Sequence, residues 1–109
     1  MTASNLLKRL IISDLGARGH LAWSNNTVGI WDPQRHIFRK NKDRSAIGTA
    51  DVVCCLKGGL YLELEVKVGE DTQSTAQQLH ERAVKQRGGL YFLVKDYDNY
   101  KQLRDWQRW

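Results

Sequence analysis

Two strand-like segments near the middle of the sequence carry acidic residues in a chain that has an excess of basic ones. The stretch GTADVVCCLKGGLYLELEVKVGED, residues 48–71, holds Asp51 in its first run and Glu63, Glu65 and Lys67 in its second. A carboxylate within a sheet is costly to desolvate unless a cation, a hydrogen-bond network or water receives it. These acids therefore need a partner.

A divalent metal ion is one partner that suits such acids. The tight Lys57-Gly58-Gly59 turn joins the two predicted strands, so folding the hairpin brings Asp51 beside Glu65. Mg²⁺ and Mn²⁺ are commonly held by one or two carboxylates together with waters and phosphate oxygens, and Lys67 would orient water or stabilise charge on a phosphate. A surface row with a Glu–Lys ion pair fits the same spacing, so the residues alone leave both interpretations open.

Hydrophobic periodicity predicts the elements that would position these side chains. We expect strands over 50–56 and 60–68, and the second alternates apolar with polar residues so that Glu63, Glu65 and Lys67 share one face. A helix follows from Ser74 to Gly88, and Ser74 and Gln77 have the spacing of a capping box. The run GLYFLVK, residues 89–95, is then typical of a strand buried on both faces.

The flanking sequence predicts further elements around this centre. Apolar residues at helical spacing favour a first helix that is capped by Ser4 or Asn5 and ends at Gly16. Strand-like pieces on either side of the 32–35 turn, Asp-Pro-Gln-Arg, indicate a β-hairpin. A last short helix surrounds Trp106. The predicted order is helix, hairpin, two strands, helix, strand, helix.

Composition limits the class of protein. The 109 residues suit one domain, 1–109, and 17 Lys and Arg against 12 Asp and Glu give a net charge of +5, which favours a polyanionic partner. No run approaches the length of a membrane span and no signal layout begins the chain, so we expect a cytoplasmic protein without membrane contact. We interpret Cys54 and Cys55 as small buried residues rather than zinc ligands.

The ordered motifs resemble a known nuclease family. Asp51 followed by Glu65-Val66-Lys67 resembles the D…ExK signature of the PD-(D/E)XK nucleases. With IGTAD, LELEVK, STAQQ and GGLYFLV in order over nearly the whole chain, the sequence looks most like the virus-type replication-repair nuclease domain, VRR-NUC, in the small stand-alone form carried by phages. The resemblance implies an α/β fold with a restriction-endonuclease-like PD-(D/E)XK core, a central mixed β-sheet flanked by helices.

The same resemblance implies roles for individual residues. Asp51 and Glu65 would be ligands of Mg²⁺, for which Mn²⁺ may substitute in such enzymes, and the backbone carbonyl of Val66 would complete the coordination. Lys67 would position the attacking water and stabilise the transition state. Gln77 matches a glutamine that the family places close to the metal, while its other role is the capping box. Together, the resemblance implies that Asp51, Glu65, Lys67 and Gln77 form the catalytic group.

Two positions depart from the family pattern or extend it. The family often has a metal-facing glutamate near the start of the first helix, and the corresponding position here is Asn5, an amide without charge. Glu63 lies one pleat from Glu65 and is either a spare ligand or, as we expect, a partner of a basic residue. Both are possible accessory residues. We expect Asp14 to be solvated, and His20 and His80 to lie on the surface.

The implied activity is that of a Mg²⁺-dependent, structure-specific DNA endonuclease in DNA repair. Stand-alone members resemble Holliday-junction resolvases, so branched DNA and a homodimer are expected, with Trp31 of the hairpin or the terminal Trp106 and Trp109 in the dimer contact. A flap or nicking endonuclease would use the same site, and a catalytically decayed nucleic-acid-binding module is a further alternative. The expected DNA contacts, which a solvated hairpin would also explain, are Arg35, Arg39, Lys40, Lys42 and Arg44.

Overall fold

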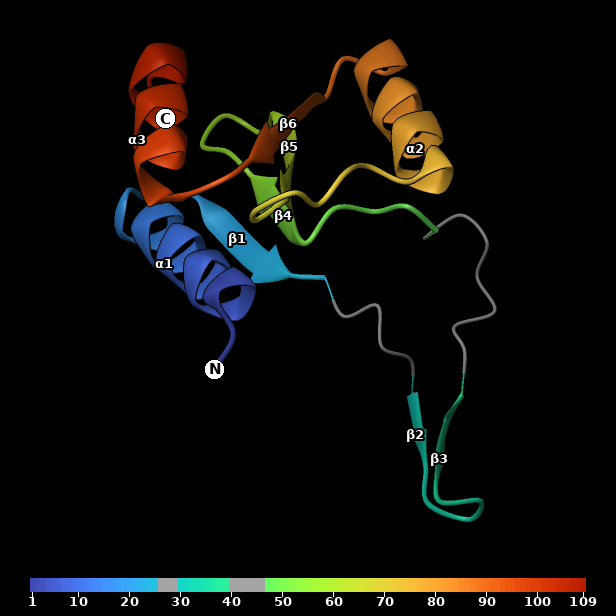
Figure 1. The fold of residues 1–109 in the computed structure, drawn as a ribbon. Coiled ribbons are helices and arrows are strands. Elements are labelled where there is room, and N and C mark those ends of the chain that lie inside the picture. Colours follow the sequence, from blue (N-terminus) through green and yellow to red (C-terminus); the bar gives the residue numbers. More distant parts are fainter. Residues whose placement is uncertain (26–29, 40–46) are drawn as a thin grey trace.

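The computed structural model describes residues 1–25, 30–39 and 47–109 (Figure 1). Within these residues the chain forms three helices and six strands. In chain order they are α1 (Ala3–Ala17), β1 (Leu21–Ser24), β2 (Ile30–Asp32), β3 (Ile37–Arg39), β4 (Val52–Cys55), β5 (Tyr61–Val66), α2 (Thr75–Gln86), β6 (Leu90–Val94) and α3 (Tyr97–Gln107).

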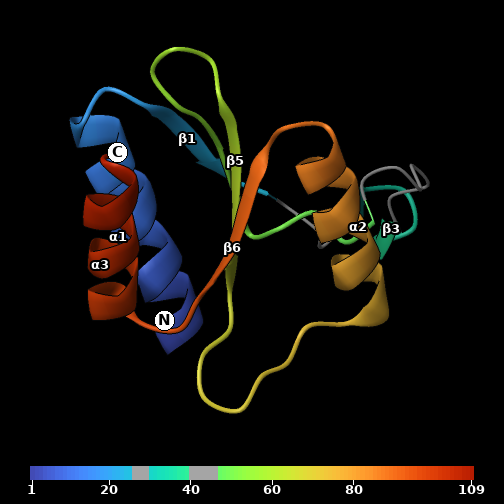
Figure 2. The ribbon, with the colours of Figure 1, turned by 90° about the horizontal axis from the view of Figure 1, so that it is seen from above.

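Four of the strands form one mixed sheet in the order β1-β4-β5-β6. The pairs β1–β4 and β4–β5 are antiparallel, whereas β5 and β6 run parallel because α2 crosses over between them. Figure 2 shows α1 and α3 on one face of this sheet and α2 on the other. The predicted α/β fold, a central mixed sheet flanked by helices, is thereby confirmed.

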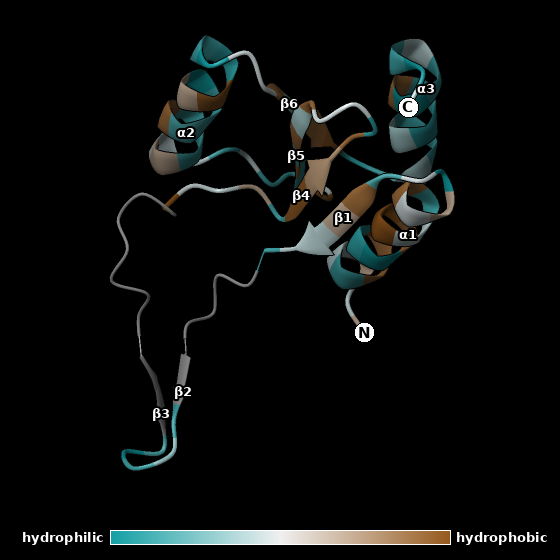
Figure 3. Cartoon of the chain, turned by 180° about the vertical axis from the view of Figure 1, so that it is seen from behind, coloured by the Kyte–Doolittle hydropathy of each residue, from teal (hydrophilic) through white to brown (hydrophobic). Residues whose placement is uncertain are grey.

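The main core lies between the sheet and the pair α1 and α3. Leu7, Ile11 and Leu15 of α1 pack there against the even-numbered apolar residues of β4 and β5, which include Cys54 and Leu64. In Figure 3 the strands of this sheet carry much of the hydrophobic colour, while the helices show both hydrophobic and hydrophilic residues. The even-numbered residues of β5 thus face the core, which leaves the odd-numbered acids on the α2 face.

Two glycine-dependent turns set the position of the strands that carry the acids. Gly58 and Gly59 both have a φ of 93°, a left-handed conformation that favours glycine, and they close the tight connection from β4 to β5. Gly48 also has a positive φ, and a Cβ atom there would lie 2.4 Å from the carbonyl oxygen of Ala76. Only glycine lets the segment before Asp51 approach the first turn of α2 so closely.

Some predicted boundaries and exposures are wrong. Helix α1 begins earlier than expected, because Thr2 is its N-cap and accepts a hydrogen bond from the backbone N–H of Asn5 at 3.1 Å. Cys55, the last residue of β4, is exposed, although Cys54 is buried as predicted. Leu93 is 43% exposed because β6 is an edge strand, so this strand is not buried on both faces.

The segment after α1 divides differently from the prediction. Its first part, β1, pairs with β4 in the main sheet, and the predicted hairpin around Pro33 is the separate two-stranded sheet of β2 and β3. The turn residues lie between Asp32 and Ile37, as expected. Hairpin formation is therefore confirmed, and β1 is an addition to the predicted element order.

Asp14 joins α1 to α3 and is not the solvated residue that the sequence led us to expect. Its carboxylate accepts hydrogen bonds from the Tyr100 hydroxyl at 2.7 Å, from Arg104 and from Arg18. Burial alone would raise the pKa of this carboxyl, but these donors outweigh burial and hold the pKa below its usual range. The contact is structural, because it fixes α3 on the far side of the sheet from the acids.

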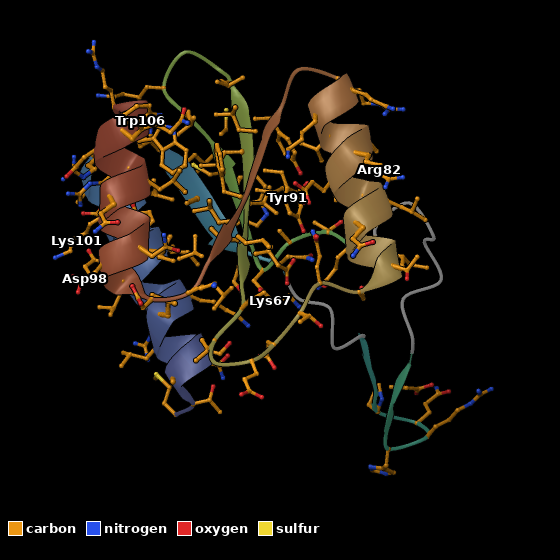
Figure 4. The ribbon with its side chains drawn as sticks, turned by 45° about the horizontal axis from the view of Figure 1, so that its top comes forward. Lys67, Arg82, Tyr91, Asp98, Lys101 and Trp106 are labelled. Atoms are coloured by element: carbon orange, nitrogen blue, oxygen red, sulfur yellow. The ribbon has the colours of Figure 1, made fainter. Side chains whose placement is uncertain are left out.

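The C-terminal tryptophans behave differently from each other. Trp109 packs against Phe92, with ring centroids 5.9 Å apart, and belongs to the periphery of the main core. Trp106 is 83% exposed on the outer side of α3 (Figure 4). Of this pair, Trp106 alone retains a large free aromatic surface.

In the part of the chain that the structure describes, no helix is long and apolar enough to cross a membrane.

Candidate active site

Asp51 and Glu65 lie opposite each other on the face of the sheet that α2 covers. The antiparallel register pairs Val52 with Leu64, and its continuation by one residue sets Asp51, just before β4, across from Glu65 of β5. The Asp51 carboxylate accepts a hydrogen bond from the backbone N–H of Val66 at 2.8 Å. The structure thus brings together the two carboxylates that the hairpin argument places side by side.

Glu65 is held on all sides by polar groups, although its side chain is almost fully buried. Its Oε1 atom accepts a hydrogen bond from Nε2 of Gln77 at 2.9 Å and lies 3.6 Å from Nζ of Lys67. Its Oε2 atom accepts from the hydroxyl of Tyr91 at 3.1 Å. The residue is 2% exposed. A carboxylate so enclosed has a fixed orientation.

The electrostatics of this pair favour a cation. Burial and, after it, the neighbouring Asp51 carboxylate raise the pKa of Glu65 to about 7, against the opposing effects of Lys67 and Tyr91. Burial likewise raises the pKa of Tyr91, which keeps its hydroxyl protonated and able to donate to Glu65. Two carboxylates that disfavour each other's charge would both be stabilised by a cation between them.

Lys67 stands at the end of the acidic row. It follows β5 directly, and its backbone N–H donates to the carbonyl oxygen of Val94 at 2.9 Å. Its side chain is only 15% exposed, which holds the ammonium near Glu65 rather than in bulk water. Figure 4 shows Lys67 at this end of the strand, with Tyr91 between the sheet and α2. The predicted Asp51, Glu65 and Lys67 group is therefore contiguous.

Gln77 belongs to the capping box of α2 and also contacts Glu65. Its Oε1 atom accepts from the backbone N–H of Ser74 at 2.8 Å, and Ser74 Oγ accepts from the backbone N–H of Gln77 at 3.2 Å, which completes the capping box. Its Nε2 atom donates to Glu65. The amide therefore couples the start of α2 to the acidic pair.

Lys8 is a site residue that the sequence reasoning missed. Its Nζ atom lies 3.4 Å from Oδ1 of Asp51, and its side chain is 23% exposed. Asn5, the position expected to face the site, is exposed in the first turn of α1. Lys8 is one turn further along the same helix, so helical spacing from Asn5 was the available signal. A cation from α1 thus contacts one of the two paired carboxylates.

Glu63 is not placed beside Asp51. It is completely buried, and its Oε1 atom accepts from the backbone N–H of Ala50 at 2.9 Å. Its Oε2 atom accepts from the Tyr61 hydroxyl and lies 2.9 Å from Nε2 of His80. Glu63 therefore has the basic partner that we expected, and His80 is not the surface residue that we predicted, because α2 packs it onto β5.

His20 also has a structural contact. Its Nδ1 atom accepts a hydrogen bond from the backbone N–H of Lys57 at 3.0 Å, which ties the end of α1 to the β4–β5 turn. Burial and the nearby positive charges of Lys57 and Arg18 lower the pKa of this histidine. Its expected surface position is therefore wrong, since the ring is partly buried in this contact.

The donor set for a metal is small. Within residues 1–25, 30–39 and 47–109, no group of three or more His, Cys, Asp or Glu side chains is arranged to hold a metal ion. Asp51 and Glu65 supply carboxylate oxygens, and further ligands would have to be backbone carbonyls, waters or substrate oxygens, a combination that Mg²⁺ accepts and structural zinc does not.

Only part of the predicted DNA-contact group can be located. Arg35 is exposed in the turn of the β2–β3 hairpin, where its guanidinium lies 3.9 Å from Asp32. Arg39 ends β3. Lys40, Lys42 and Arg44 lie outside the described residues. Figure 1 shows the hairpin apart from the four-stranded sheet that holds the acids.

Comparison with known proteins supports the fold. No protein-family model and no curated protein matches the sequence. A solved structure described as a VRR_NUC domain matches with a TM-score of 0.68 over 96% of this chain and 97% of that chain, at 17% sequence identity. The chain therefore has the fold of a VRR_NUC domain, which confirms the motif-based resemblance at the level of the fold.

Proposed function

We propose that this protein is a metal-dependent nuclease that hydrolyses phosphodiester bonds in DNA. The observation that carries the proposal is the pairing of the Asp51 and Glu65 carboxylates across the β4–β5 hairpin, with Lys67 at 3.6 Å from Glu65. The VRR_NUC fold supports it, because the name of the matching structure describes a nuclease domain. The net charge of +5 suits a polyanionic substrate.

The donor set fits Mg²⁺, for which Mn²⁺ can substitute. Asp51 and Glu65 would be the carboxylate ligands, and the backbone carbonyl of Val66, whose N–H already contacts Asp51, would be a third. When bound, such an ion supplies charge neutralisation for the phosphate and lowers the pKa of water. The raised pKa of Glu65 supports a cation site, because a bound cation would stabilise the charged form of this carboxyl.

The surrounding side chains would position the reacting groups. Gln77 and Tyr91 hold the two oxygens of Glu65 in place. Lys67, which is mostly shielded from solvent, would hold the attacking water through its ammonium and stabilise the negative charge that develops on the phosphate. Glu63 would act indirectly, by holding other groups in position. Its contacts fix Tyr61, His80 and the backbone before Asp51.

Lys8 is expected to weaken metal binding. Because its ammonium lies 3.4 Å from Asp51 Oδ1, it competes with a divalent cation for that oxygen. The Lys8→Met variant should therefore bind Mn²⁺ about three- to tenfold more tightly, a modest change because the pair is partly exposed and screened. Isothermal titration calorimetry measures this, with the exposed neighbour changed in Arg9→Met as the matched control. Equal or weaker binding in Lys8→Met would contradict the expectation.

We further propose structure-specific cleavage of branched DNA by a homodimer that resembles Holliday-junction resolvases. Two opposed nicks in a four-way junction need two active sites, which a two-fold dimer supplies. The exposed Trp106 supports a contact through α3, whereas Trp109 is used within its own chain. The side chain of Trp31 lies outside the part of the structure that is described. A monomeric flap or nicking endonuclease would use the same active site.

A second candidate is a nucleic-acid-binding module whose catalytic site has decayed. Lys8 at Asp51, together with Asn5 in place of an acid, is the observation that favours it. Incubation of the protein with junction, flap, bubble and duplex DNA in Mg²⁺ separates these possibilities. Cleavage of the branched substrates is the expected result, and sedimentation with the junction gives the oligomeric state. Binding without cleavage of any substrate in Mg²⁺ or Mn²⁺ would overturn the nuclease proposal.

A further inference from the structure

A cavity of about 540 Å³ lies between α2 and β5. Its wall includes Tyr61 and Glu63 of β5, and His80, Val84 and Arg87 from α2 and its C-cap. A cavity of this volume is large enough for a ligand of nucleotide size. It is far too small for a DNA duplex, so only an unpaired group of a nucleic acid could enter it.

The cavity lies on the same side of the sheet as the candidate active site, because Glu63, which lines the cavity, shares one face of β5 with Glu65. Helix α2 runs antiparallel to β5. This orientation is seen in two contacts: Gln77 contacts Glu65, and His80, one turn later in the helix, contacts Glu63, which is earlier in the strand. Glu63 is two residues from Glu65 on the same face of β5, a separation of about 7 Å along a strand. If the phosphate of one nucleotide lies at Glu65, the next nucleotide of the same strand would therefore lie at the cavity.

At the buried end of the cavity, near Glu63, the lining residues suit a base rather than a phosphate. The rings of Tyr61 and His80 flank the cavity, and the remaining wall is largely aliphatic, as at Ala83 and Val84. Glu63 is fully buried and its oxygens are occupied by Ala50, Tyr61 and His80, so these contacts hold both rings in place. Aromatic side chains held in this way stack bases without regard to sequence.

The outer end of the cavity carries a cation. Arg87 is exposed, and one nitrogen of its guanidinium donates to the carbonyl oxygen of Ala83 at 2.9 Å. That bond anchors the side chain at the cavity, while a guanidinium has five N–H donors in all and can engage a phosphate with the others. Aromatic rings followed by an arginine match the alternation of base and phosphate along a single strand.

We propose that this cavity is a subsite for one unpaired nucleotide adjacent to the scissile phosphate. Its base stacks against Tyr61 and His80, and the next phosphate of the strand binds Arg87. The proposal rests on the proposed nuclease function and narrows it, because the substrate must be single-stranded immediately beside the cut. Flaps, gaps and the opened centre of a junction meet this requirement, and continuous duplex does not.

Two DNA substrates of identical sequence test the subsite. In one the strand beside the branch point is unpaired, and in the other a complementary strand pairs it. Binding is measured with Ca²⁺ in place of Mg²⁺, so that affinity is read without cleavage, and 2-aminopurine beside the branch point reports base stacking by its fluorescence. The wild-type protein should bind the unpaired form about tenfold more tightly, in line with the stacking of one base.

Four variants assign the effect to the cavity. Ala83→Leu fills the cavity and should abolish the preference for the unpaired form, whereas Ala83→Ser, of similar size, should keep it. Arg87→Gln should also reduce the preference. Arg82→Gln removes the same charge from the side of α2 that faces away from β6 (Figure 4) and should leave it unchanged. Circular dichroism confirms that each variant is folded.

The outcomes separate this inference from the nuclease proposal. An unchanged preference in folded Ala83→Leu, or equal wild-type affinity for the two substrates, overturns the subsite even if Mg²⁺ supports cleavage. A preference that disappears in Ala83→Leu supports the subsite even if no DNA is cut. In that case the absence of cleavage contradicts the nuclease proposal and not the subsite.

Discussion

Replacement of Asp51 with Asn is expected to reduce DNA cleavage in Mg²⁺ or Mn²⁺ by about a thousandfold or more. The amide keeps the size of the side chain and can still accept the hydrogen bond from the backbone N–H of Val66. It removes the negative charge that, together with Glu65, would hold the proposed metal ion. Single-turnover cleavage rates measure the loss, and binding of DNA in Ca²⁺ should be largely intact because the basic residues are unchanged.

Asp98→Asn provides the matched control for this substitution. Asp98 lies on α3, on the other side of the sheet, where its partner is Lys101 (Figure 4). The same chemical change there should leave the cleavage rate within about twofold of wild type, as for ordinary surface positions. Undiminished turnover in Asp51→Asn, with thermal unfolding like that of the wild type, would remove Asp51 from the active site.

Replacement of Lys67 with Ala should lower the cleavage rate by a factor of about 10² to 10⁴ while metal binding persists. The proposed role of the ammonium is toward water and phosphate, so the carboxylate ligands remain when it is removed. Loss of its charge at 3.6 Å from Glu65 should leave Mn²⁺ affinity equal to or higher than that of the wild type. Cleavage rates and calorimetry with Mn²⁺ measure the two effects separately.

The exposed Lys101, changed in Lys101→Ala, serves as the control for Lys67. Its ammonium pairs with Asp98 on α3, so its removal should alter neither cleavage nor Mn²⁺ affinity. If Lys67→Ala cleaves DNA at the wild-type rate, Lys67 has no catalytic role. If the variant is inactive because it no longer binds Mn²⁺, the proposed division between metal ligands and Lys67 is wrong.

The pairing of the two carboxylates could be predicted because its geometry is local. The alternation of apolar and polar residues in β5 sets Glu63, Glu65 and Lys67 on one face, whatever surrounds the strand. The turn at Gly58 and Gly59 then determines the register with β4, since a tight turn leaves little freedom in pairing. Asp51 therefore meets Glu65 for reasons that are contained in residues 51–65.

The contacts around the pair could not be derived in the same way. Lys8 contacts Asp51 from α1. Tyr91 contacts Glu65 from β6, the strand parallel to β5. His80 contacts Glu63 from α2. In each contact, hydrophobic periodicity predicts the two helices or strands correctly. It does not predict how these elements pack against each other. The same holds for β1, a short edge strand with mostly exposed residues that becomes recognisable through its pairing with β4.

The sequence by itself determined the main elements, the face of β5 that carries the acids, the Asp51–Glu65 pairing and the resemblance to a VRR_NUC domain. The tertiary structure alone decided which cation lies at Asp51, that Asp14 joins two helices, and that a cavity lies between α2 and β5. The physical reason is the range of the interactions. Backbone alternation and tight turns act within a few residues, whereas helix packing on a sheet depends on burial summed over the whole chain.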